Sequence, residues 1–255
     1  MPRYDFRSPR LYIDAPLAAG TRLALDAAQA NYLKNVMRLK AGDGVLVFNG
    51  RDGERRASLT DGGKRSVALV VGEQTRPQTR PRDLHYLFAP LKHARLDYMV
   101  QKAVEMGASR LQPVTMQHGQ VGRINLERMR ANAIEAAEQC GILSIPDIAE
   151  PISFERMIAT REPSRVLIFC DEAADVRDPV AALAAARKGA ESPPLAVLIG
   201  PEGGFAEHER SALNALPNVV RLALGPRILR ADTAAVAALA LVGAVLGDWR
   251  GDPEG

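Results

Sequence analysis

Short apolar runs separated by turn residues occupy the first third of the chain. The runs VLVFNG, ERRASLT and RSVALVV lie between Val45 and Val71 and are separated by RDG and DGGK. Turns of this kind between β-prone runs are typical of hairpins, so the region predicts a β-meander or a small β-barrel. The next segment, Glu73–Asp83, holds two prolines, three arginines and no apolar residue. This composition predicts an exposed linker between a first domain at residues 1–75 and a second at residues 82–255.

Strand-like and helical patterns alternate from residue 84 onward. Asn125 is a good N-cap for a helix that runs to Gly141, and Asp178 followed by Pro179 begins a helix that ends before Gly189. Further helices are predicted over residues 92–107, 206–216 and 233–246, and strands in LHYLFA (84–89), RLQPVTM, RVLIFCDE, LAVLIG (195–200) and VVRLAL (219–224). Regular alternation of strand and helix predicts an α/β fold with a mostly parallel sheet and helices on its faces.

Composition places the chain among ordinary globular proteins. Of its 255 residues, 47% are hydrophobic and 25% are charged, which excludes disordered and collagen-like chains. Cys140 and Cys170 are too few for a disulfide framework, and the four histidines have no metal-ligand spacing, so no metal site is predicted. The N-terminus lacks the apolar core of a secretory signal, and the apolar stretch Thr233–Gly247 is shorter than the ~20 residues of a membrane-spanning helix. We therefore expect a cytoplasmic protein that does not enter membranes.

Charge is distributed unevenly, although the formal net charge is only +3. Residues 1–82 hold 15 Lys and Arg against 8 Asp and Glu, a net +7, whereas residues 83–255 hold 18 against 22, a net −4. A basic N-terminal part suggests a polyanionic partner such as nucleic acid. A solvated, Arg-rich surface explains the same charges equally well, and charge by itself does not decide between the two.

Three predicted strands end in residues that suit a ligand site, because ligands of open α/β sheets bind beyond the carboxyl ends of the strands. These ends are FCDE (Phe169–Glu172), IGPEGGF (Ile199–Phe205) and LGPRILRADTA (Leu224–Ala234). The glycines of the second end let the backbone approach a ligand closely, although a plain strand-to-helix turn also needs glycines. This loop has neither the Lys-Ser/Thr of a P-loop nor the GxGxxG spacing.

The third strand end carries charges that packing does not explain. Arg227, Arg230 and Asp232 lie between a buried strand and an Ala-rich buried helix. Arg227 is equally well a solvated loop charge, and Asp232 an N-cap or early-turn residue of the helix. Arg230 is the strongest candidate, because a guanidinium is permanently charged and suits an oxyanion or a phosphate. By contrast, four charges of the helix at 92–107 are interpreted mainly as solvated side chains that at most border a site: Lys92, Arg95, Lys102 and Glu105.

These loops, together with other motifs, resemble one enzyme family. IGPEGGF is followed, after a helix and a strand, by LGPRILRADTA. Upstream lie VMRLKAGD (36–43) with VFNG, a K-x4-D-x4-K-x2-E-x-G pattern from Lys92 to Gly107, and EAAEQCG (135–141). In this order, and over nearly the whole chain, the motifs resemble the bacterial small-subunit (16S) ribosomal RNA uridine-N3 methyltransferases of the SPOUT class. The combination is specific, whereas GPEGG or a basic N-terminus alone is not.

The resemblance implies a PUA-like N-terminal β-barrel that binds RNA and a C-terminal SPOUT-type α/β domain with a trefoil knot. It also implies S-adenosylmethionine as cofactor, S-adenosylhomocysteine as product, no metal, and a homodimer whose cofactor pockets lie close to the subunit interface. The loops that match the family put the cofactor against Leu198, Gly200, Glu202, Gly203, Leu224, Gly225, Ile228 and Leu229.

The implied activity is methylation of a specific uridine at N3 in small-subunit ribosomal RNA, either free or in the assembled small subunit, during ribosome biogenesis. Removal of the imide proton needs a base or a solvent path and a cation that stabilises the resulting charge. We predict that Arg230 is this cation and that Asp232 either orients Arg230 or assists deprotonation. N3 lies on the Watson–Crick edge, so the target is unpaired or flipped. Phosphate contacts are expected from Arg3, Arg7, Arg10, Arg22, Lys34, Arg38 and Lys40.

The chain departs from the family pattern at three positions. Ile142 follows EQCG where many members have Arg, Asp232 stands where Glu is commoner, and Ala234 replaces a frequent Thr. The first removes a cation expected at an RNA or interface contact, whereas the second keeps the charge. Two alternatives stay open: a SPOUT methyltransferase acting on another RNA position, such as a ribose 2′-hydroxyl or a transfer-RNA guanine, and a non-catalytic RNA-binding module of ribosome assembly whose loops hold phosphate.

Overall fold

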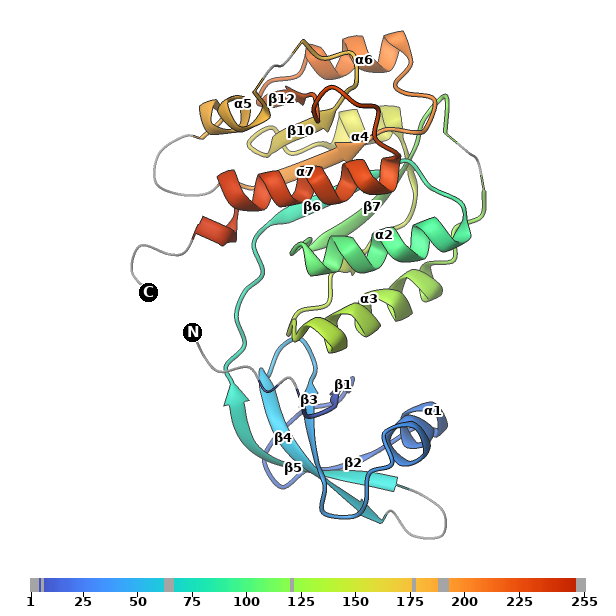
Figure 1. Cartoon of the computed structure of the whole chain (residues 1–255), viewed down its shortest axis with the longest axis vertical. Helices are drawn as coiled ribbons and strands as arrows, with labels where there is room; N and C mark the ends of the chain where they lie inside the picture. The colour runs from blue at the N-terminus through green and yellow to red at the C-terminus, as the bar shows by residue number, and fades with distance from the viewer. Residues whose placement is uncertain are drawn as a thin grey trace. The chain divides into compact units, whose positions relative to one another are not determined.

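A computed structural model of the chain describes residue 5 and residues 7–61, 67–119, 122–175, 178–187 and 193–250 (Figure 1). The chain divides into two compact units. The first consists of Met1–Arg80 and Ala137–Ile145, and the second of Pro81–Ala136 and Pro146–Gly255. No signal in the sequence indicates that residues 137–145 group with the first unit.

The first unit contains a five-stranded sheet with the order β1–β3–β4–β5–β2. The strands are β1 (Arg10–Tyr12), β2 (Arg22–Ala24), β3 (Gly44–Phe48), β4 (Glu54–Asp61) and β5 (Val67–Arg76). Strands β3, β4 and β5 form the predicted antiparallel meander, and β1 pairs with β3 in parallel. The predicted linker is wrong at its beginning, because β5 continues to Arg76, which pairs with Glu54 across the sheet.

A helical segment that the sequence pattern did not predict connects β2 to β3. It consists of α1 (Ala27–Asn31) and a π-helical turn, η1 (Tyr32–Val36). Asp26 caps α1 by accepting a hydrogen bond from the backbone N–H of Gln29, whose side chain accepts one from the N–H of Asp26. Leu33 of η1 is fully buried in the apolar core of this unit. Burial of this one apolar side chain fixes the turn and leaves its polar neighbours in solvent.

The second unit contains a parallel sheet with the order β12–β10–β11–β6–β7–β8, and β9 pairs with β7. This arrangement confirms the mostly parallel sheet predicted from the alternation of elements. The strands are β6 (Leu84–Phe88), β7 (Arg110–Thr115), β8 (Asp147–Ile148), β9 (Ile152–Ser153), β10 (Val166–Cys170), β11 (Leu195–Ile199) and β12 (Val219–Leu222).

Helices cover both faces of this sheet, which explains why β10 and β11 are apolar along their whole length (Figure 1). The helices are α2 (His93–Glu105), α3 (Leu126–Cys140), α4 (Phe154–Thr160), α5 (Pro179–Ala185), α6 (Glu207–Asn214), α7 (Ala231–Val245) and the short η2 (Asp248–Arg250). On one face Leu87 and Leu198 pack with side chains of α4 and α6, and on the other the Tyr86 hydroxyl donates to the sulfur of Met99 on α2. α7 lies beside α2 and α5 and contacts β11.

The strand order brings three loops together. β10 lies between β11 and β12, and all three strands run parallel. Their carboxyl ends therefore meet at one edge of the sheet, where the loops that follow Cys170, Ile199 and Leu222 are neighbours.

Candidate functional site

A cavity of about 510 Å³ opens where these three loops meet. This volume lies within the ~300–1,000 Å³ typical of small-molecule sites. Residues 170–172 and 199–205 and most of residues 222–231, together with Ala234 of α7, line it. All three strand ends predicted from the sequence thus contribute to one cavity.

The GPEGG loop needs glycine because of what lies beneath it. A Cβ on Gly200 would come within 2.9 Å of the Phe205 ring, which is buried edge-on against Phe169. Gly204 has a φ of +72°, and a Cβ there would lie 2.6 Å from a carboxylate oxygen of Glu172. The backbone N–H of Gly204 donates to the carbonyl oxygen of Pro201. The loop is therefore a tight turn that has no room for a larger side chain at Gly200 or Gly204.

A buried carboxylate fixes the base of the cavity. Asp171, directly after β10, accepts hydrogen bonds from Arg210 of α6 and Arg221 of β12 at 2.8 and 2.9 Å. Burial raises the pKa of this carboxyl, but the hydrogen bonds from Arg210, from the Ala173 N–H and from Arg221 outweigh burial and lower it below its usual value. Asp171 is thus ionised at neutral pH and joins three elements of the site.

Cys170 lines the cavity without being a nucleophile. Burial raises the pKa of its thiol to about 12. Since the thiolate is the reactive form, this side chain packs as a small apolar group, as its position in RVLIFC suggests.

The structure brings most of the predicted cofactor residues together. Leu198 is the exception, because it is fully buried in β11 and packs with Phe205 below the loop. The cavity is lined by Gly200, Glu202, Gly203, Leu224, Gly225, Ile228 and Leu229.

The two predicted catalytic residues lie at the beginning of α7. Arg230 is the N-cap residue, is exposed and lines the cavity. Asp232 lies in the first turn, accepts a hydrogen bond from the Thr233 N–H at 2.8 Å and is not among the lining residues. Within the described part of the chain no hydrogen bond joins Arg230 to Asp232. Arg227 is also exposed and lines the cavity.

Most of the predicted RNA contacts are exposed in the first unit, but Arg10 is not. Its guanidinium is buried and donates to Glu54 at 2.7 Å, while Arg76 donates to the same oxygen at 2.6 Å. We therefore remove Arg10 from the expected phosphate contacts, because its charge is already neutralised inside the unit. Arg3 lies outside the described residues, and the exposed members of the set are Arg7, Arg22, Lys34, Arg38 and Lys40.

Sequence reasoning did not assign a role to several residues that shape the site. Glu172 lines the cavity beneath Gly204, and Phe205 supports Gly200. Glu209, buried in the first turn of α6, accepts hydrogen bonds from the N–H groups of Gln117 and Ala206 and so ties the loop after β7 to this helix. An acidic residue within an otherwise apolar helix face was the signal available for Glu209.

Two other kinds of feature are absent from the described residues. They contain no group of three or more His, Cys, Asp or Glu side chains placed to hold a metal ion. None of their helices combines the length and apolarity that crossing a membrane requires.

Two family models match the chain. Residues 78–243 match an RNA methyltransferase domain, and residues 25–72 match an RNA methyltransferase PUA domain. Among curated proteins, the Ribosomal RNA small subunit methyltransferase E of Synechocystis sp. is 32% identical over 88% of this chain and 73% of its own length. The protein of the same name from Rickettsia conorii is 29% identical over 91% of this chain and 94% of its own length.

Solved structures of similar proteins share the fold. A Ribosomal RNA small subunit methyltransferase E from Neisseria gonorrhoeae, bound to S-adenosyl methionine, superposes with a TM-score of 0.79 at 26% identity, covering 95% of this chain and all of that one. A putative methyltransferase from Legionella pneumophila, in complex with the same cofactor, has a TM-score of 0.79 at 27% identity, covering 93% and 98% of the two chains.

Proposed function

Because this chain belongs to the RNA methyltransferase family, with both its methyltransferase and its PUA domain, we propose that it methylates N3 of a uridine in small-subunit ribosomal RNA with S-adenosylmethionine. One observation carries the proposal. The GPEGG and LGPRILR loops, far apart in the sequence, line a single cavity at the carboxyl ends of parallel strands, with Arg230 among its lining residues.

The cavity fits S-adenosylmethionine in size and chemistry. Phe205, Leu224 and Leu229 provide apolar surface for an adenine ring, and the glycines of the GPEGG loop allow a ligand to approach the backbone closely. Glu172 and Glu202 are carboxylates that suit a cationic amino group. No sequence feature or described side-chain group calls for a metal as well.

When bound, S-adenosylmethionine supplies a methyl group already activated on a sulfonium, so the protein needs only to bind, orient and manage the proton. Arg230, permanently charged and exposed beside the cavity, stabilises the negative charge that the uracil imide acquires as it loses its N3 proton. The proton passes to solvent or to Asp232, two residues away on α7. An orienting role of Asp232 toward Arg230 requires the side chains to rearrange when RNA binds.

The first unit supplies RNA affinity in this proposal. Among the exposed cations expected to contact phosphate, Arg22 lies on β2 and Lys34 on η1, and the others lie in loops. Each phosphate contact strengthens RNA binding by an amount that falls as the salt concentration rises. Three further expectations belong to the same proposal and stay predictions: the trefoil knot, action in the cytoplasm, and a homodimer. The side chain of Ile228, an apolar residue of the cavity loop that is 91% exposed, supports a partner at that loop.

The cofactor part of the proposal is tested with a substitution that fills the cavity from a helix. Ala234→Phe places a ring into the cavity, whereas Ala244→Phe places the same ring on an exposed position of the same helix. By calorimetry we expect S-adenosylmethionine to bind the wild type and Ala244→Phe alike and to lose binding to Ala234→Phe. Equal binding to all three proteins contradicts the assigned cavity.

The position of methylation is tested by product analysis. Small-subunit ribosomal RNA transcribed in vitro, and small subunits assembled on it, are incubated with enzyme and labelled cofactor, digested to nucleosides and separated. We expect 3-methyluridine. A 2′-O-methyl nucleoside or a methylated guanosine overturns the N3 assignment while keeping the methyltransferase, and absence of any product favours the non-catalytic RNA-binding module.

A further inference from the structure

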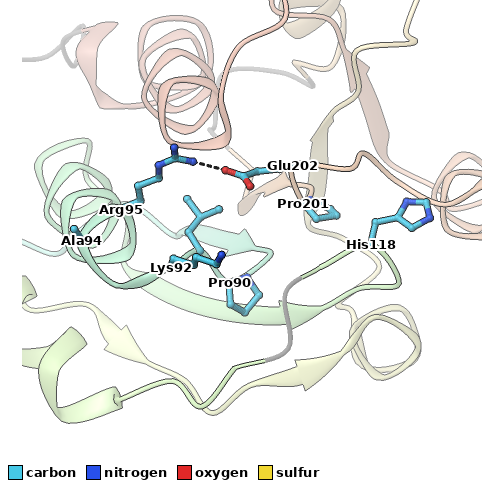
Figure 2. Close-up of a pocket in the computed structure, with 8 residues that line it drawn as sticks. Pro90, Lys92, Ala94, Arg95, His118, Pro201 and Glu202 are labelled. Carbon is cyan, nitrogen blue, oxygen red and sulfur yellow. Dashed lines mark hydrogen bonds and ion pairs between the residues drawn. The ribbon is translucent and has the colours of Figure 1, made fainter.

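A second cavity lies at the same edge of the sheet and also includes part of the GPEGG loop (Figure 2). Its volume is about 380 Å³. The residues before and in the first turn of α2 form one side, and the loop after β7 and the GPEGG loop form the other. We call this cavity the α2 pocket and define it by Pro90, Lys92, Arg95, His118, Pro201 and Glu202.

Cationic groups predominate in the α2 pocket. Lys92 is exposed at the N-cap position of α2, and its side chain does not cap the helix. Arg95 lies one turn further and forms an ion pair with Glu202, the one carboxylate among the residues that line the pocket. The first turn of this 13-residue helix adds the partial positive charge of its N–H groups. The pocket thus has the chemistry of an anion site, with one of its two cations held by a carboxylate.

The α2 pocket and the cofactor cavity share the GPEGG loop. Pro201 and Glu202 line both. His118, which lines the α2 pocket, places its Nδ1 3.2 Å from the carbonyl oxygen of Gly204. A Cβ on Gly203 would lie 3.0 Å from the Cβ of His118. Whatever binds in the α2 pocket therefore lies next to the cofactor, where the strand that carries the target nucleotide must also run.

We propose that the α2 pocket binds a phosphodiester group of the RNA strand beside the target nucleotide, and that this phosphate replaces Glu202 as the partner of Arg95. The proposal rests on the proposed function, because it takes RNA as the substrate. Arg and Lys are the side chains that bind phosphate through charge-assisted hydrogen bonds. Glu202 keeps the charge of Arg95 neutralised until RNA arrives and then becomes available to the cofactor cavity, which it also lines.

Lys92 and Arg95 also suit a second anion, the carboxylate of the cofactor. The two sources predict different measurements. An RNA phosphate makes RNA affinity and its salt dependence respond to loss of Lys92 or Arg95, whereas a cofactor carboxylate makes S-adenosylmethionine affinity respond without RNA.

The experiment compares Lys92→Ala and Arg95→Ala with Lys102→Ala in the full-length protein. Lys102 lies on the same helix but outside the pocket and pairs with Glu105. Binding of unmethylated small-subunit ribosomal RNA is measured at several salt concentrations, and binding of S-adenosylmethionine by calorimetry. For each pocket variant we expect the slope of log K against log salt to fall by about 0.7 to 0.9, and RNA affinity to drop roughly fivefold at 0.1 M salt. Lys102→Ala should leave the slope unchanged. Lys92→Ala and Lys102→Ala should bind the cofactor like the wild type, and Arg95→Ala, which releases Glu202 toward the cofactor cavity, should bind it at least as tightly.

Glu202→Gln tests the exchange of partners because its expected effect has the opposite sign. Without this carboxylate, nothing competes with the RNA phosphate for Arg95, so the Glu202→Gln variant binds RNA more tightly than the wild type does.

Unchanged slopes in Lys92→Ala and Arg95→Ala overturn the phosphate site. Weaker cofactor binding in these two variants assigns the pocket to the cofactor carboxylate instead. If the wild type methylates RNA while the pocket variants bind RNA normally, this inference fails and the proposed function stands. If the wild type binds neither RNA nor small subunits, the proposed function itself fails.

Discussion

Arginine has two different roles in this protein, and burial separates them. Arg10 and Arg165 are buried and satisfied by carboxylates, Glu54 for the first and Asp83 for the second, so their charges hold the fold together. Arg230 is exposed and lines a cavity. A buried guanidinium that is paired with a carboxylate is not available to bind a ligand. An exposed guanidinium is able to stabilise negative charge that develops during a reaction.

Glu54 is a buried carboxylate that joins three side chains of the first unit. It accepts hydrogen bonds from Arg10, Arg76 and Thr75. Glu54→Gln removes the carboxylate that the buried Arg10 guanidinium shares with the partly buried Arg76, and we expect a loss of about 3–5 kcal/mol in the free energy of unfolding. The control is Asp14→Asn, which breaks an exposed pair with Arg51 and should change stability by less than about 1 kcal/mol. Urea unfolding followed by circular dichroism measures both.

The same carboxylate predicts how stability depends on pH. Burial raises the pKa of Glu54, but the hydrogen bonds from Arg76, Arg10 and Thr75 outweigh burial and lower it from 4.5 to about 2. The folded state therefore binds this proton less readily than the unfolded state. Its contribution to stability is complete above pH 4.5 and is lost as the pH falls toward 2. Unfolding free energy measured across this range should fall less steeply in Glu54→Gln, and an identical pH profile refutes the assignment.

In our proposal, turnover depends on Arg230. In Arg230→Ala we expect methyl transfer to become undetectable. The dissociation constant of S-adenosylmethionine should change by less than about threefold, because the cation acts on the uracil and not on the cofactor. Arg230→Lys keeps the charge without the planar guanidinium and should recover part of the rate. Normal turnover in Arg230→Ala removes this side chain from the mechanism.

At the scale of elements, the site depends on three strand ends held in register. Asp171 joins the end of β10 to α6 and β12 through Arg210 and Arg221. The GPEGG loop is held from below by Phe205 and from the side by His118. These supports lie outside the chemistry, yet they determine where the backbone groups of the cavity point.

Substitution of Asp171 tests this dependence. Asp171→Asn keeps the shape of the side chain but removes the charge that two arginines share, so we expect a loss of about 1–3 kcal/mol in stability and weaker cofactor binding. Glu207→Gln is the matched control, since Glu207 contacts the same Arg210 from an exposed position. Thermal unfolding and calorimetry provide the two readouts. If Asp171→Asn is destabilised but binds the cofactor with wild-type affinity, the ion pairs of Asp171 with Arg210 and Arg221 serve the fold alone.

At the scale of the whole molecule, the two compact units carry different tasks in our proposal. The first unit includes residues 137–145, and Tyr12 and Arg76 make hydrogen bonds with Glu138 and Gly141 of that segment. Deleting residues 1–80 therefore removes the hydrogen-bond partners of residues that stay behind. Surface substitutions separate the tasks of the units more cleanly than truncation.

A triple variant, Arg7→Ala with Lys34→Ala and Lys40→Ala, removes exposed cations of the first unit. Arg38 is left intact because its backbone has a φ of +56°, so a substitution there would change backbone strain as well as charge. We expect the salt slope of RNA binding to fall by about two to three and cofactor affinity to stay at the wild-type value. Arg51→Ala, which removes an exposed cation paired with Asp14, serves as control. An unchanged slope in the triple variant refutes the assigned RNA-binding role.

Local features of the fold were readable from the sequence. The N-caps predicted at Asn125 and Asp178 both accept hydrogen bonds from the first turns of their helices. The apolar runs that end in Cys170 and Ile199 are buried strands of a parallel sheet. Such features depend on neighbours within a few residues, because caps, turns and side-chain periodicity are set by local backbone geometry.

By itself, the sequence determined the alternation of strands and helices, the three strand ends with their glycines and charges, and the family resemblance. Only the tertiary structure decided the order β12–β10–β11, which makes one cavity of three distant loops. It also decided that Arg10 is buried against Glu54 and that Arg95 pairs with Glu202. The physical reason is that strand order and the choice of ion-pair partner follow from packing between segments many residues apart, on which local propensity has no influence.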